Sequence, residues 1–118
     1  MVAGLYIGDA SGGNSVNVHI GYNGGAYADS GIVRVEQSVS GASTSRATAR
    51  IPLGATAYLR ITRTAGGVIS CWYSENGLLW QWLNTVTATP TIAMVGHNMF
   101  QSSVSPLYVA VDWLRTSV

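Results

Sequence analysis

The sequence contains no lysine, a single cysteine and few charged residues of either sign. Charged residues make up 9% of the chain, whereas an average soluble domain has about 25%. The six arginines are dispersed and the net charge is only +1, but a nucleic-acid-binding surface needs positive charge concentrated on one face. We therefore expect no nucleic-acid partner. A surface built largely from Gly, Ser, Thr, Asn and small apolar side chains suits a domain that works inside an assembly.

The lone cysteine and the lack of long apolar runs limit the expected location and partners of the protein. Cys71 has no second cysteine to pair with, so no intrachain disulfide is expected. No run approaches the ~18 apolar residues of a membrane span, and residues 1–6 lack the basic and apolar regions of a signal peptide. We expect no membrane partner and a location in a virion or outside the cell, reached by lysis or through an export signal on another part. The alternative is that the chain stays in the cell that makes it.

Hydrophobic residues make up 47% of the 118 positions, enough for the core of one domain spanning residues 1–118. Apolar and polar residues alternate along much of the chain, most clearly where Val16, Val18 and Ile20 alternate with polar neighbours. Gly- and Asn-rich turns separate such segments, and no capped helical pattern occurs. This pattern predicts an all-β, two-layer antiparallel β-sandwich of about nine strands. The predicted strands are 3–8, 15–22, 31–38, 46–51, 56–64, 68–74, 79–86, 91–97 and 106–115.

Two connections between these strands have a composition that predicts their structure. Residues 38–48 are rich in Ser, Ala and Thr, so we expect a long, mobile loop there. Asn76 and Gly77 form a dipeptide that readily adopts the positive φ angles of a type I′ hairpin turn. Residues 57–64, 68–74 and 79–85 should then form a three-stranded meander, with Trp80 folding back on the hairpin.

The segment of this meander that reads YLRITR, followed by CWYSENGLLW, resembles a signature of concanavalin A-like domains. Residues 3–7 and 109–115 resemble the opening and closing strands of the same superfamily, which includes laminin-G-like accessory modules and phage-fibre-type domains. The resemblance implies a jelly-roll sandwich and says little about function. It also implies that the early strands of the family are absent, so the chain is either the C-terminal part of a larger protein or a minimal sandwich.

No arrangement of reactive residues predicts an enzyme. Glycoside hydrolysis needs two carboxylates that flank one bond, and no two of the five acids have a spacing that suggests such a pair. Cys71 lies in mid-strand between bulky residues, as expected for an inert core thiol rather than a nucleophile. The five acids are Asp9, Asp29, Glu36, Glu75 and Asp112, and the two histidines are His19 and His97.

We expect no metal or other cofactor, with calcium as the one alternative that stays open. Zinc would need a closer set of ligands than one cysteine and two distant histidines. Calcium takes several oxygen ligands from loops, and Asp9, Asn14 and Asp29 could supply some of them.

Carbohydrate binding is the most specific ligand hypothesis that the residues support. Protein sites hold sugars with aromatic faces and a few well-placed polar side chains. The alternative for each tryptophan is a place in the core or in an interface. The candidate carbohydrate-binding residues are Asn17, His19, Tyr22, Asn23, Tyr27 and Trp82.

Two function classes remain, and neither is enzymatic. The first is a structural subunit of a virion or similar assembly, such as a capsid-decorating or fibre protein that packs against copies of itself or a shell protein. Residues 91–97 are almost entirely apolar on both faces, and strands of that kind are normally covered on both sides. The second class is a lectin-like module that recognises glycans on a cell surface or polysaccharide.

Overall fold

Eight β-strands form within the residues that the structure, a computed structural model, describes: 2–9, 13–21, 30–52, 56–87 and 94–100. The described residues contain no helix, and so none with the length and apolar character needed to cross a membrane. In chain order the strands are β1 (Val2–Gly8), β2 (Ser15–Gly21), β3 (Ser30–Val39), β4 (Ala42–Pro52), β5 (Tyr58–Arg63), β6 (Val68–Ser74), β7 (Gln81–Thr87) and β8 (Met94–Phe100).

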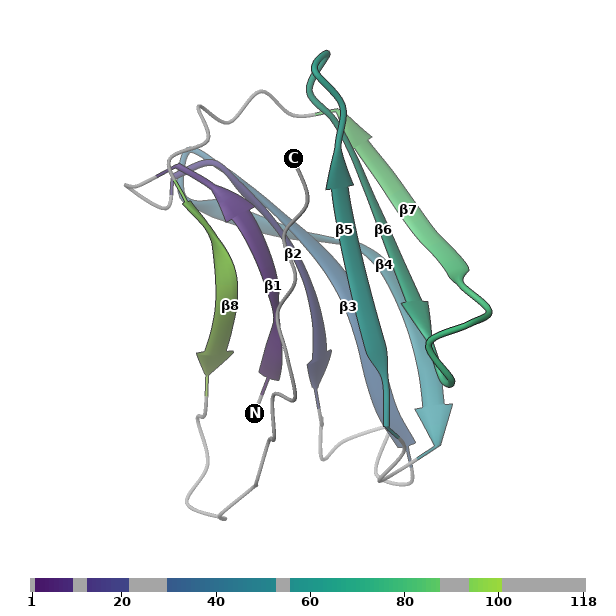
Figure 1. Cartoon of the computed structure of the whole chain (residues 1–118). Helices are drawn as coiled ribbons and strands as arrows, with labels where there is room; N and C mark the ends of the chain where they lie inside the picture. The colour runs from purple at the N-terminus through teal and green to yellow at the C-terminus, as the bar shows by residue number, and fades with distance from the viewer. Residues whose placement is uncertain (1, 10–12, 22–29, 53–55, 88–93, 101–118) are drawn as a thin grey trace.

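The strands form two antiparallel sheets (Figure 1). One sheet has five strands in the order β4-β3-β2-β1-β8, and the other has three in the order β5-β6-β7. Strands β1 to β4 follow one another as a meander, and β8 returns to pair with β1, placing Val2 opposite Phe100. The chain thus leaves the larger sheet after β4 and comes back to its opposite edge after the smaller sheet is complete.

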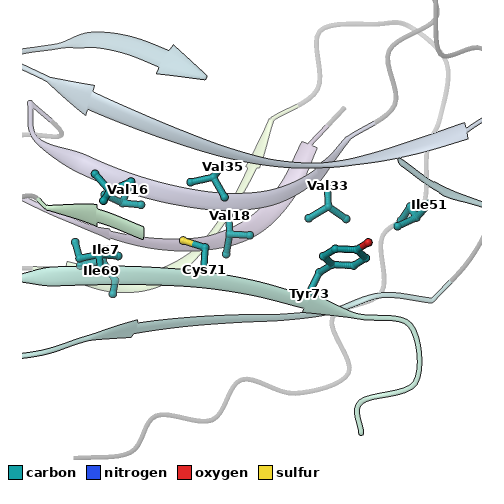
Figure 2. Packing of buried hydrophobic residues seen from close by; sticks show 10 residues of the cluster. Ile7, Val16, Val18, Val33, Val35, Ile51, Ile69, Cys71 and Tyr73 are labelled. Carbon is teal, nitrogen blue, oxygen red and sulfur yellow. The ribbon is translucent and has the colours of Figure 1, made fainter. Parts of the chain in front are cut away.

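A single cluster of buried apolar side chains joins the two sheets (Figure 2). Valines of β2 and β3 face residues of β6 across the interior, and Ile69 and Cys71 have no exposed surface. This burial is the main favourable contribution to folding, because it removes apolar area from water. The buried members are Ile7, Val16, Val18, Val33, Val35 and Ile51 from the larger sheet, and Ile69, Cys71, Tyr73 and Val86 from the smaller one.

The predicted all-β class and the meander of residues 57–85 are confirmed, since β5, β6 and β7 pair in sequence. The predicted strand at 106–115 lies outside the described residues, as do residues 91–93 of the predicted strand 91–97.

The mobile loop predicted at residues 38–48 is wrong. Strands β3 and β4 continue through this region as a hairpin, with Val39 opposite Ala42. The two residues between them, Ser40 and Gly41, have φ angles of 52° and 85°, and two positive φ angles are the mark of a type I′ turn. The prediction failed because β4 is an edge strand made of small polar residues over its first part. Residues 42–46 are exposed, so backbone pairing rather than burial keeps them in a strand.

Candidate functional site

The structure does not bring the predicted carbohydrate-binding residues together on one face. Asn17 and His19 alternate with core valines of β2 and therefore face outward from the five-stranded sheet. Trp82 faces outward from the three-stranded sheet, on the opposite side of the molecule. Tyr22, Asn23 and Tyr27 lie outside the described residues. The two outer faces are therefore separate candidates.

A β-bulge places Trp82 on the surface. Asn84 lies opposite Cys71 while Trp82 lies opposite Trp72, so β7 carries one extra residue, Leu83, at this point. Uninterrupted alternation would put Trp82 on the same face as Asn84, which is the face of the core. The extra residue reverses the alternation, a common effect of bulges. Leu83 packs against the core and Trp82 is 61% exposed.

Hydrogen bonds hold the exposed Trp82 ring in place. Its Nε1 donates to Thr85 Oγ1 at 3.1 Å, and Thr85 Oγ1 lies 3.0 Å from Ser70 Oγ on the neighbouring strand. The indole N–H is therefore satisfied within the protein, and the ring does not need to reorganise when it meets a ligand. Such preorganisation lowers the entropic cost of binding.

An arginine and two further tryptophans extend this surface across the sheet. The Arg60 guanidinium carbon lies 4.1 Å from the centroid of the Trp80 ring, within the range of a cation–π interaction. Arg60 is paired with Trp72, and Trp72 with Trp82, so the three form a row across β5, β6 and β7. We call the surface formed by Arg60, Trp72, Trp80, Trp82 and Thr85 the tryptophan face.

The three strands of the smaller sheet carry charge of one sign, and the loop between β6 and β7 adds one exposed acidic residue, Glu75. Strands β5, β6 and β7 contain Arg60 and Arg63 and no acidic residue. Arg34 forms an ion pair with Glu36 on the other sheet, at an N–O distance of 3.5 Å. The tryptophan face therefore combines exposed aromatic surface, hydroxyl groups and positive charge.

The loop between β6 and β7, residues 75–80, projects apolar side chains next to the tryptophan face. Ser74 Oγ accepts hydrogen bonds from the backbone N–H groups of Asn76 and Gly77 at 3.3 and 2.9 Å. Asn76 Oδ1 accepts from the N–H groups of Leu78 and Leu79 at 2.8 and 2.9 Å. With their backbone fixed in this way, the Leu78 and Leu79 side chains remain 82% and 74% exposed.

The type I′ turn predicted at Asn76 and Gly77 is wrong, although the hairpin itself is present. Gly77 has a φ of 74°, but Asn76 does not have a positive φ. The side chains of Ser74 and Asn76 bind backbone N–H groups instead, which stabilises a wider connection than a two-residue turn.

On the outer face of the five-stranded sheet, His19 is buried rather than open to a ligand. His19 is 4% exposed and lies opposite Arg34, whose guanidinium is 3.5 Å from the Glu36 carboxylate. Burial lowers the pKa of His19 below its ordinary value of 6.5, the Glu36 charge raises it and the Arg34 charge lowers it further. On the other side, Gly4 packs so closely against His19 that a Cβ there would clash. This packing leaves His19 little surface with which to touch a sugar.

Asp9 and Asn14, two of the three possible calcium ligands, lie together, but their polar atoms mainly tie loops to each other. Asn14 Nδ2 donates to Asp9 Oδ2 at 2.7 Å, and Asn14 Oδ1 accepts from Ser40 N at 3.2 Å. The pair thus connects the turn after β1 to the turn after β3. Asp29, the third, lies outside the described residues, within which no group of three His, Cys, Asp or Glu side chains could hold a metal ion.

The one thiol lies in the core, as the sequence predicted. Cys71 has no exposed surface, and burial raises its pKa from 9.0 to about 12. A thiol with that pKa is almost entirely protonated at neutral pH and is a poor nucleophile. Of the other residues considered for catalysis, Glu75 lies exposed in the loop before β7, Glu36 pairs with Arg34, and Asp112 lies outside the described residues.

Comparison with known proteins gives no match to any family model, any curated protein or any solved structure. The sequence predicts Trp82 as a site residue but not its neighbours Arg60, Trp72, Trp80 and Thr85. The spacing of Trp80 and Trp82 gave no usable signal, because Trp80 lies in the loop before β7 rather than in the strand, and the bulge that aims Trp82 outward has no clear signature in the sequence.

Proposed function

We propose that this domain is a non-enzymatic structural and interaction subunit of a virion or similar assembly, of the capsid-decorating or fibre type. The observation that carries the proposal is the exposure of Leu78, Leu79 and Trp82 on one sheet and its loop. Soluble monomers rarely expose large contiguous apolar patches, and those that are exposed usually mark interaction sites. The partner is a copy of the same chain or a shell or fibre protein that covers these side chains.

The proposed fold is a jelly-roll sandwich of the concanavalin A-like type, with a ninth strand among the residues beyond Phe100. Two antiparallel sheets joined by one apolar core support it. The sequence resemblance supports it as well, because the segment that carries the resemblance forms β5, β6 and the loop that follows.

A non-enzymatic role is supported by the state of the reactive residues that the structure describes. The Cys71 thiol is buried, His19 packs against the backbone of Gly4, and Glu36 is paired with Arg34. Each of these groups has a structural role where it lies, and none is placed beside an accessible partner for proton transfer or nucleophilic attack.

A second candidate function is carbohydrate recognition by a lectin-like domain. The observation that favours it is the orientation of Trp82, whose ring is exposed while its indole N–H is bound to Thr85. Aromatic rings presented in this way form stacking surfaces for ligands that carry an apolar face and polar edges.

The mass of the native particle tests the assembly proposal. Light scattering near neutral pH should show a multimer, since the net charge is close to zero and little repulsion opposes association. Replacing both Leu78 and Leu79 with Ser should shift the particle toward the monomer. Val39→Ser is the matched control, because Val39 is 51% exposed but lies in the other sheet. A wild-type chain that stays monomeric at high concentration and has no partner in its native setting would contradict the proposal.

A further inference from the structure

We infer that the tryptophan face binds a carboxylate-bearing carbohydrate, with a sugar ring stacked on Trp82 and a carboxylate held by Arg60. This inference rests on the second candidate function and assigns that function its ligand class and its contacts.

The stacking surface is the exposed ring of Trp82. The ring is fixed by its hydrogen bond to Thr85, and its outward direction is set by the bulge at Leu83. The apolar side of a pyranose ring covers an indole face, while its hydroxyl groups point outward to polar neighbours. Ser70 and Thr85 place two hydroxyl groups beside the ring for this purpose.

The carboxylate site is the guanidinium of Arg60. Its carbon lies 4.1 Å over the centroid of the Trp80 ring, which restrains the group, and a guanidinium that stacks on an aromatic ring can still donate hydrogen bonds from its edge. No acidic side chain forms an ion pair with it among the described residues. A planar guanidinium donates two parallel hydrogen bonds to a carboxylate, and such charge-assisted bonds are the strongest that a surface site offers.

The distance between Arg60 and Trp82 sets the length of the ligand. Arg60, Trp72 and Trp82 occupy neighbouring strands in one row. Strands lie ~4.8 Å apart, so the backbones of Arg60 and Trp82 are separated by about 10 Å. A disaccharide is long enough to place one ring on Trp82 and the carboxylate of the next sugar at Arg60. The three strands contain no acidic residue, so a uronic or sialic acid polymer lying across them meets little repulsion; Glu75, in the loop before β7, is the one acidic side chain nearby in the sequence.

Binding of the full chain to four acidic polymers tests the inference: polygalacturonate, alginate, hyaluronan and polysialic acid. Methyl-esterified polygalacturonate is the matched neutral probe, because it keeps the sugar and removes the charge. At least one acidic polymer should bind, and added salt should weaken the binding. Trp82→Ala and Arg60→Gln should each reduce affinity by about tenfold or more. Arg63→Gln, which removes the same charge from the same strand, should change affinity by less than about twofold.

Two further variants separate loss of the site from loss of the fold. Trp82→Phe keeps an aromatic ring and should retain most of the binding. Thr85→Val removes the hydroxyl that accepts from the indole at nearly constant volume, so binding should weaken while the melting temperature stays close to wild type.

The possible outcomes separate failure of this inference from failure of carbohydrate recognition, the candidate function on which it rests. If the neutral ester binds as well as the acid, and Arg60→Gln has no effect while Trp82→Ala does, carbohydrate recognition stands and the acidic ligand is wrong. If none of the polymers binds, both are wrong. If Trp82→Ala lowers the native particle mass and no polymer binds, the face is a contact between protein subunits, and the inference is overturned.

Discussion

Gly77 shows how much a single residue can contribute to the exposed loop before β7. It has a φ of 74°, and a Cβ at this position would lie 3.4 Å from ring carbons of Tyr58. Gly77→Ala should therefore lower the free energy of unfolding by about 1–2 kcal/mol, since a non-glycine residue is strained at positive φ. Urea unfolding followed by tryptophan fluorescence would measure this change.

Gly66→Ala is the matched control for that substitution. Gly66 also lies in a hairpin loop, but its φ is not positive and a Cβ there would meet only Thr64 Oγ1, at 3.8 Å. We expect a change below about 0.5 kcal/mol. Equal losses in the two variants would show that the backbone angle at Gly77 is unimportant.

At the scale of strands, the pairing of β2 with β3 makes stability depend on pH through His19. Its pKa is lowered in the folded state, mainly by burial, so the unfolded chain binds a proton at higher pH than the folded chain does. Stability should be complete above pH 6.5 and should fall as the pH drops through the lowered pKa of the folded state. Unfolding in urea between pH 7.5 and 5 would measure the slope, which should become shallower in the His19→Gln variant. A slope that is the same in both would mean that His19 does not titrate differently on folding.

The strands themselves were largely predictable, and their irregularities were not. Residues 68–74 were predicted with the bounds that β6 has, because Ile69, Cys71 and Tyr73 alternate with partly exposed neighbours. Strand β4 was missed over residues 42–45, where no apolar residue marks a buried face. Hydrophobic periodicity marks strands that bury one face. An exposed edge strand that is held only by backbone pairing therefore shows little periodicity in its sequence.

The edge of the five-stranded sheet shows how a chain without lysine protects an exposed strand. Strand β4 carries one extra residue, Arg46, opposite the step from Val35 to Glu36. Arg46 donates from Nε to Gln37 at 2.9 Å, and its carbonyl accepts from Asn84 of the other sheet at 2.9 Å. A bulge that carries a charge interrupts the regular ladder that another strand would need for pairing. Assembly through the exposed Leu78 and Leu79 side chains is therefore a better expectation than assembly through this edge.

For the whole molecule, stability depends on the contact between the two sheets. Ile69 lies at that contact with no exposed surface. Ile69→Ala should cost about 2–5 kcal/mol through lost burial and the cavity left behind. Leu79→Ala removes a similar side chain that is 74% exposed, and it should change the free energy of unfolding by less than about 0.5 kcal/mol. Chemical denaturation of both variants would compare them, and similar losses would mean that the sheets do not depend on this core.

The pairing of β1 with β8 has a consequence for how the protein is made. Val2 pairs with Phe100, so β8, which is one of the two neighbours of β1, is synthesised after all the other described strands. Contacts between residues so distant in sequence slow folding, because a long loop must close before they form. Until β8 leaves the ribosome, one edge of β1 has unsatisfied backbone groups, and nascent chains on neighbouring ribosomes could pair there. Slower translation would prolong that interval, so the yield of folded protein in cells should depend on synthesis rate and temperature as well as on equilibrium stability.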